Sequence, residues 1–295
     1  MLRFGYDIGG TNIAAGVIDE KNRLIAKDSV KFPRGEGTDA VIAACADLYR
    51  KILRDSLIAE EEIVGVGVAV PGSVSPETGV VIDAHNLGFH HTPLAAMLHE
   101  VLCKDVYLIN DADAATLAEH RIGSLSGTKT SMMITIGTGI GGGLIIDGEL
   151  FRGGRGNGTE PGHMVLCNGG RLCSCGISGC AETYCSATRL CKDGAAFGKT
   201  TAKEVIEAAK EGNEQAIALF HAYIDDLGSY IASIVNLLDP ERIAIGGGVS
   251  GAGSFLLDPL RRDVERKCFF ETCTELVVAS AGNDAGIVGA GLIVS

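Results

Sequence analysis

Residues 173–182, CSCGISGCAE, place three thiols and a carboxylate close together in the chain, and His163 adds an imidazole shortly before them. One imidazole and three thiolates form the ligand set of a closed structural zinc site, with no position left open for a catalytic water. The glycines between Cys175 and Cys180 allow the tight turns that such a site needs. We therefore predict a structural zinc ion bound by His163, Cys173, Cys175 and Cys180.

Two further cysteines, Cys167 and Cys185, lie near this motif and are alternative ligands. The chain contains ten cysteines, and nothing in its N-terminal sequence indicates secretion, so thiols or metal ligands are expected rather than a disulfide framework. The five cysteines outside residues 167–185 are predicted to be small core residues: Cys45, Cys103, Cys191, Cys268 and Cys273.

Three glycine-rich turns follow predicted strands, at Gly9-Gly10-Thr11, at residues 137–143 and at residues 246–248. Backbone N–H groups in such turns can converge on phosphate oxygens, and the missing Cβ lets the backbone come close to them. GTGIGG has the spacing of a dinucleotide fingerprint, but a strand follows it instead of a helix. GGGVSG fits that fingerprint better, yet no acidic residue closes the next strand, so a dinucleotide enzyme is the weaker alternative.

An apolar strand in LINDADAA ends at Asn110 and Asp111, and a helical pattern begins there. A carboxylate at such a junction can act as a general base, whereas Asn-Asp is also a common helix cap. The local pattern alone favours the cap.

The strands predicted around these residues form a pattern that occurs twice in the chain. Strands are predicted at 4–8, 12–18 and 23–32, followed by a helix at 39–59 and a buried strand at 63–70. The strand, glycine turn and strand recur at residues 131–153, so the chain is expected to form two related α/β halves with a cleft between them. The strongest helical stripe spans 213–240, and the strands 242–245 and 275–280, the helix 255–267 and a short C-terminal helix follow.

Composition limits the classes of partner. The 295 residues carry a net charge of −12, which disfavours a nucleic-acid surface because phosphate backbones are bound by clustered Lys and Arg. No apolar run is long enough to cross a bilayer, and no signal peptide is visible. A cytoplasmic enzyme with a small-molecule substrate is expected.

Together these segments resemble the ROK family, bacterial sugar kinases and related repressors of the actin-like ATPase superfamily. The resemblance rests on DIGGTNIAAGVID, NDADAA, GTGIGGG, EPGH with CSCGISGCAE, and IAIGGGVS, and it covers nearly the whole chain. It implies a two-lobed actin-like, ribonuclease H-like α/β fold with an interlobe cleft. The lobes are expected at residues 1–115, with 281–295 packing back on them, and at 116–280, which include the zinc-binding loop.

The resemblance also implies roles for individual residues. Asp111 would be the catalytic base, and Asp7 would lie near Mg²⁺. The sugar-binding residues would be Asn110, Glu160, His163 and Glu182, bordered by Gly72 and Asn86. The phosphate-binding residues would be Gly9, Gly10, Thr11, Thr138, Gly139, Gly247 and Gly248. The sequence departs from the family pattern at Asp113, where Asn is usual, and at Pro161, where an aliphatic residue is common.

The activity implied is phosphorylation of the 6-hydroxyl of a hexose, glucose above all, by ATP with Mg²⁺ and a structural Zn²⁺. Kinases of the family that act on N-acetylmannosamine, N-acetylglucosamine or fructose are alternatives. An acetamido group is accommodated by the shape of a loop near the second carbon of the sugar, and the sequence does not specify that shape. A sugar-responsive repressor would need a helix-turn-helix domain before Asp7, and we expect none. A homodimer is also expected.

Overall fold

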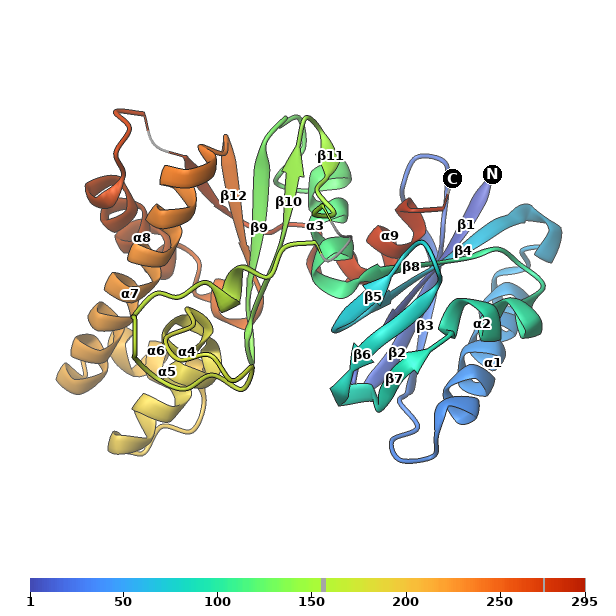
Figure 1. Cartoon of the computed structure of the whole chain (residues 1–295), viewed down its shortest axis with the longest axis horizontal. Coiled ribbons are helices and arrows are strands. Elements are labelled where there is room, and N and C mark those ends of the chain that lie inside the picture. The colour runs from blue at the N-terminus through green and yellow to red at the C-terminus, as the bar shows by residue number, and fades with distance from the viewer. Residues whose placement is uncertain (155–157, 273, 295) are drawn as a thin grey trace. The chain divides into compact units, whose positions relative to one another are not determined.

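The computed structural model describes residues 1–154, 158–272 and 274–294. The chain forms two compact units (Figure 1). The first comprises Met1–Gly123, Leu150–Gly158 and Ala281–Ser295, and the second comprises Ser124–Glu149 and Thr159–Ser280. The boundary therefore lies at Gly123 instead of the expected residue 115, and a short segment after residue 149 returns to the first unit, which the sequence did not reveal.

A five-stranded sheet forms the centre of the first unit, in the order β3-β2-β1-β4-β8. The antiparallel strands are β1 (Leu2–Ile8), β2 (Asn12–Ile18) and β3 (Leu24–Lys31), and β4 (Ile63–Val70) and β8 (Val106–Asn110) run parallel to β1. Because β1, β4 and β8 are parallel, their carboxyl ends lie at one edge of the sheet. That edge carries Asp7, and Asp111 directly follows β8.

Helices cover this sheet. The helix α1 (Thr38–Ser56) buries a stripe that includes Val41, Leu48 and Ile52, and α2 (Leu94–Leu102) lies beside it (Figure 1). A small antiparallel sheet, β5 (Ser73–Ser75), β6 (Val80–Ala84) and β7 (Phe89–Thr92), was not predicted. Short 3-10 turns lie at η1 (Glu60–Glu62), η2 (His85–Leu87) and η6 (Gly282–Asp284).

The C-terminal helix α9 (Ala285–Leu292) packs on the same sheet. A Cβ added at Gly67 of β4 would lie 1.8 Å from the Ala290 carbonyl oxygen, so only glycine admits the helix this close. The helix α3 (Asp111–Ile122) packs against α9 through Ala114 and Ala118, which cluster with Ala290, Ala285 and Val288. All of α3 therefore belongs to the first unit, and a boundary at residue 115 would have divided it.

The second unit repeats the sheet order as β11-β10-β9-β12-β13. The strands are β9 (Ser131–Ile136), β10 (Ile140–Ile146), β11 (Glu149–Leu150), β12 (Arg242–Gly246) and β13 (Glu275–Val278). The β9–β10 pair is antiparallel, and β9, β12 and β13 are parallel, as are β1, β4 and β8. The predicted duplication is confirmed.

Helices of the second unit pack around α7 (Glu214–Leu238), whose buried stripe includes Phe220, Leu227, Ile231 and Val235 (Figure 1). Asn213 caps its start by accepting the Ala216 N–H at 2.9 Å. The other helices are α4 (Glu182–Cys185), α5 (Ala187–Gly194), α6 (Ala202–Lys210) and α8 (Ser254–Lys267), with 3-10 turns η3 (Pro161–His163), η4 (Ala195–Phe197) and η5 (Gly248–Ala252).

Most predicted strands and long helices occur within two or three residues of their expected ends. The helix α1 stops at Ser56 rather than at residue 59, because Leu57 adopts the left-handed conformation that ends a helix. Among the isolated cysteines, Cys45 is buried as predicted, but Cys103 is exposed and Cys191 and Cys268 are only partly buried. Cys273 lies outside the described residues. Within the described chain, no helix is long and apolar enough to span a bilayer.

Candidate active site and metal centre

Two carboxylates lie near each other at the carboxyl ends of the parallel strands of the first unit. Asp7 is the penultimate residue of β1, and Asp111 is the first residue of α3. Burial raises the pKa of Asp7 to about 6, and the charge of Asp111 contributes to that rise. Burial also raises the pKa of Asp111, while the backbone N–H of Ala112, which donates to its Oδ1 at 2.8 Å, acts in the opposite direction. The structure thus brings the predicted base and the predicted magnesium neighbour together.

Asn110 links the start of α3 to the segment after β4. Its side-chain oxygen accepts the N–H groups of Ala112 at 2.8 Å and Asp113 at 3.2 Å, so it is the N-cap that the local pattern indicated. Its Nδ2 donates to the Gly72 carbonyl oxygen at 2.9 Å. Two of the residues implied for sugar binding, Asn110 and Gly72, are therefore in direct contact, and the cap holds Asp111 in a defined position.

The first glycine turn joins β1 to β2. The Gly9 N–H donates to the Asn12 carbonyl at 2.9 Å, and Thr11 is exposed. Arg34, in the loop after β3, donates from Nη2 to the Gly10 carbonyl at 3.1 Å. A Cβ on Gly10 would lie 3.7 Å from the Asn86 carbonyl oxygen, so Asn86 also borders this turn.

Sequence reasoning missed Arg34. It lines a hollow next to this turn together with Asn86, His85 and Thr38. The signal was available in PRGEG, which places a cation in a glycine-containing loop directly after the third strand of the first sheet. The contact with Gly10 could not be predicted, because only the folded chain lays that loop against Gly10.

The second and third glycine turns lie together in the second unit. Gly137 and Gly139 close the β9–β10 turn through an N–H to carbonyl bond of 3.0 Å, with Thr138 exposed at its tip. Gly247 and Gly248 follow β12, which runs parallel to β9. A Cβ on Gly247 would lie 2.4 Å from the Ile136 carbonyl oxygen, and its φ of 81° favours glycine as well. The four predicted phosphate-binding residues of this unit therefore share one edge of its sheet.

Glu182 and Glu160 belong to different parts of the zinc-binding loop predicted for this unit. Glu182 begins α4, and its Oε2 accepts the Ile140 N–H at 3.0 Å. Glu160 is exposed and precedes η3, and its carbonyl accepts the His163 N–H at 3.1 Å. The residues predicted for the first unit, from Asp7 to Asp111, and those from Thr138 to Gly248 thus form two groups, one in each unit.

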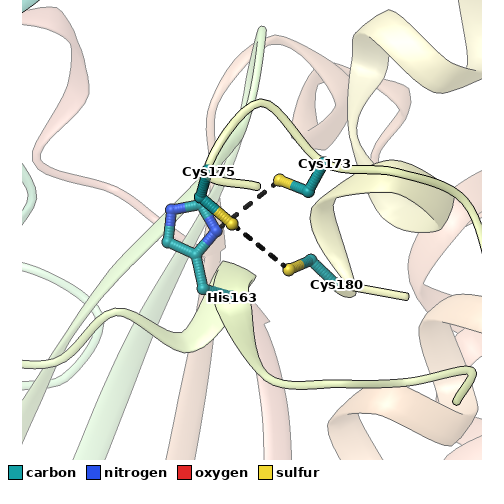
Figure 2. Close-up of side chains that lie close together, drawn as sticks. All are labelled: His163, Cys173, Cys175 and Cys180. Atoms are coloured by element: carbon teal, nitrogen blue, oxygen red, sulfur yellow. Dashed lines mark hydrogen bonds between the residues drawn. The ribbon is translucent and has the colours of Figure 1, made fainter. Parts of the chain in front are cut away.

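The four predicted zinc ligands form one cluster (Figure 2). Their ligand atoms all lie within 4.8 Å of one another. The Sγ atoms of Cys175 and Cys180 are 3.6 Å apart, and the Sγ of Cys173 is 3.8 Å from Nδ1 of His163. Two thiolates bound to one tetrahedral zinc at about 2.3 Å lie about 3.8 Å apart, so the spacing suits this metal.

The thiols of the cluster shift the pKa values of one another. Burial raises the pKa of Cys180 to about 12, and the neighbouring thiols Cys175 and Cys173 add to the rise. The pKa of Cys175 is lowered, chiefly by the backbone N–H of Ile177. Thiolates packed this closely repel one another unless a cation lies between them, and a coordinating metal keeps them ionised. The donor set and its geometry therefore fit a structural metal ion.

The alternative ligands Cys167 and Cys185 are not in this cluster, which is the only such group of His, Cys, Asp and Glu side chains among residues 1–154, 158–272 and 274–294. Cys167 is exposed. Cys185 is buried in the hydrophobic core of the second unit, and burial raises the pKa of its thiol. This arrangement is consistent with the prediction that the glycines between Cys175 and Cys180 let the chain turn around the site.

Comparison with known proteins places the chain in a family. The ROK family profile matches residues 3–295. The glucokinase of Halalkalibacterium halodurans is 33% identical over 98% of this chain and 94% of its own length. The N-acetylmannosamine kinase of Haemophilus influenzae is 31% identical over 98% of this chain and 94% of its own length. A ROK family glucokinase from Streptomyces griseus, solved in complex with glucose and AMPPNP, superimposes with a TM-score of 0.84 at 31% identity, covering 99% of both chains.

The chain belongs to the ROK family. Its two-unit α/β architecture is that of the actin-like ATPase fold of the ROK sugar kinases, as the resemblance implied.

Proposed function

We propose that this chain is an ATP-dependent hexokinase that phosphorylates the 6-hydroxyl of glucose. The observation that carries the proposal is Asp111, a carboxylate with a raised pKa held at the first turn of α3 by the Asn110 cap. A general base functions best when its pKa approaches the working pH, and burial moves Asp111 in that direction. The glucokinase from Halalkalibacterium halodurans and the Streptomyces griseus complex with glucose and AMPPNP support glucose and ATP as substrates.

In the proposed reaction, Asp111 accepts the proton of the 6-hydroxyl as that oxygen attacks the γ-phosphorus of ATP. The new O–P bond forms while the bond from phosphorus to the oxygen of ADP breaks, so ADP leaves with the electron pair. Magnesium would neutralise phosphate charge when bound, and Asp7 would hold it or its waters. Most of the rate enhancement would come from orientation, because the protein supplies little covalent chemistry.

We assign the substrate contacts to the residues that the family resemblance implies. Asn110, Gly72 and Asn86 would contact the sugar in the first unit, and Glu160, His163 and Glu182 would contact it in the second. The backbone of Gly9, Gly10 and Thr11, of Thr138 and Gly139, and of Gly247 and Gly248 would contact phosphates. Since Nδ1 of His163 faces Cys173, its Nε2 would be the nitrogen offered to a sugar hydroxyl.

Zinc would be held by His163, Cys173, Cys175 and Cys180, and its contribution is structural because four protein ligands complete the tetrahedron. We expect one zinc ion per chain. The homodimer and the cytoplasmic location expected from the sequence remain predictions.

A kinase for N-acetylmannosamine is the second candidate, supported by the Haemophilus influenzae relative. An assay that couples ADP release to a spectroscopic signal tests both candidates with one panel: glucose, mannose, fructose, N-acetylglucosamine and N-acetylmannosamine. Glucose should give the highest kcat/KM. Preference for an acetamido sugar would replace glucose with that substrate, and ADP release that depends on no sugar would contradict the proposal.

A further inference from the structure

Glu182 connects the Cys/His cluster to the glycine turn between β9 and β10. One carboxylate oxygen, Oε1, lies 3.7 Å from the Sγ of Cys173. The other, Oε2, accepts the N–H of Ile140 at 3.0 Å, the first residue of β10 after the turn. The same side chain therefore contacts a member of the cluster and one end of the turn.

Gly139 and Glu182 fit against each other. A Cβ on Gly139 would lie 2.1 Å from Oε2 of Glu182, closer than any non-bonded contact allows. Glycine at this position therefore leaves the space that the carboxylate occupies. By contrast, a Cβ on Gly137 would meet nothing within 4 Å, so the close fit is confined to one side of the turn.

The segment after Glu182 holds the other end of the same turn. The N–H of Ala187 donates to the Gly137 carbonyl at 2.9 Å. The segment is itself anchored, because the hydroxyl of Tyr223 donates to the Cys185 carbonyl at 2.7 Å in the core of the second unit. Residues 182–187 thus contact both ends of the turn, and their own position depends on the cluster on one side and on α7 on the other.

We propose that Glu182 is a positioning residue for the Gly137–Gly139 turn, and that the Cys/His cluster acts through it on nucleotide binding as well as on the sugar. This inference rests on the proposed function, in which that turn contacts phosphate. The physical reason is that a backbone turn binds phosphate well only if its N–H groups are fixed in advance, and the Ile140 contact fixes one end of it.

The first test compares Glu182→Ala with Glu182→Gln, using ADP as the probe and calorimetry in the absence of any sugar. Glutamine keeps an oxygen that can accept the Ile140 N–H, whereas alanine does not. Glu182→Ala should weaken ADP binding about tenfold, as expected for loss of a hydrogen bond to a charged acceptor, and Glu182→Gln should stay within about threefold of the unsubstituted protein. If Glu182 contacts only the sugar, ADP affinity will be the same in all three proteins, and the proposal is overturned.

The second test does not depend on activity. Hydrogen exchange at the Ile140 amide should become about tenfold faster in Glu182→Ala and in Gly139→Ala, whose new methyl group displaces the carboxylate, and should stay slow in Gly137→Ala. Gly139→Ala also covers the case in which Glu182→Ala does not fold. Unchanged exchange at Ile140 in Gly139→Ala would overturn the proposal.

A third test concerns the cluster itself and compares Cys173→Ser with Cys167→Ser. Cys167 carries a thiol in the same loop but lies outside the cluster. Only the first should speed exchange at Ile140, and equal exchange in both variants would remove the cluster from this role. If the unsubstituted protein fails to bind ADP, the proposed function is wrong, while the exchange rates still decide whether Glu182 positions the turn.

Discussion

The two units have the same sheet order, but they hold the carboxylates beside their glycine turns in different ways. In the first unit, Asp7 lies within a strand and Asp111 directly follows one, so the sheet itself places them. In the second unit, Glu182 comes from outside the sheet: it is the first residue of the short helix α4, directly after the segment that carries the cysteines of the cluster, and it contacts the turn from there. The sheet thus places these carboxylates in one half, and the segment of the Cys/His cluster places Glu182 in the other.

This difference predicts different consequences of substitution. A carboxylate that lies in a strand of the sheet or directly follows one is held by the fold, so replacing it should remove chemistry and leave the site intact. Glu182 lies outside the sheet and contacts the cluster through Cys173, so breaking the cluster should impair binding although no reacting group is lost.

The largest effect is expected for Asp111→Asn. This change keeps the size of the side chain but removes the proposed base, so turnover should fall about 10²–10⁴-fold with little change in sugar affinity. Steady-state kinetics and sugar titration measure the two quantities. Asp113→Asn is the matched control, since it replaces a carboxylate two residues along the same helix, and it should keep turnover within about threefold. Retained turnover in Asp111→Asn would remove Asp111 from the mechanism.

Cys175→Ser tests the second unit. Loss of one ligand should abolish stoichiometric zinc and raise the sugar KM about 10–100-fold, because the loop that carries His163 and Glu182 loses its fixed shape. The effect on nucleotide affinity should be smaller. Metal analysis and kinetics provide the measurements, with Cys167→Ser as the control. Active protein without zinc, or normal sugar affinity in Cys175→Ser, would contradict the structural role of the cluster.

Asp7→Ala should affect the first unit differently from Asp111→Asn. We expect the Mg²⁺ and ATP concentrations needed for half-maximal rate to rise about tenfold, as is typical when a group that orders a metal ion is removed, while sugar binding stays measurable. Kinetics over a Mg²⁺ series, together with calorimetry for the sugar, test this. An unaltered Mg²⁺ dependence with weaker sugar binding would mean that Asp7 has been assigned to the wrong ligand.

A further effect concerns stability instead of catalysis or binding. The pKa of Asp7 is about 6 in the folded chain against 3.8 as the ordinary value, so the folded state binds this proton more tightly than the unfolded state. Its contribution to stability therefore falls as the pH rises from about 4 to 6, by up to about 3 kcal/mol, and stays low above that range.

Asp7→Asn removes this buried charge and should raise Tm at pH 7 without Mg²⁺, while flattening the dependence of Tm on pH between 4 and 6. Calorimetric scans across this range check the sign. A lower Tm at pH 7 would show that the carboxylate stabilises the folded state instead.

The sequence by itself determined the repeated strand, glycine turn and strand, the long helix α7, the four members of the cluster and the Asn110 cap. These features depend on residues near one another in the chain, and the glycines and alternating apolar residues that produce them have local physical causes. The prediction of zinc for the cluster also followed from residue types, because three thiols and one imidazole are a typical ligand set of structural zinc.

Only the tertiary structure decided which distant residues meet. Nothing local in AGIVGAGL indicates that its helix lies on Gly67, or in PRGEG that Arg34 reaches Gly10, because both contacts join segments separated by many residues. The same holds for Glu182, whose neighbour Ile140 lies in a strand far earlier in the chain. Packing of whole helices and sheets determines these contacts, so they depend on the sum of many weak interactions and not on a pattern that one segment carries.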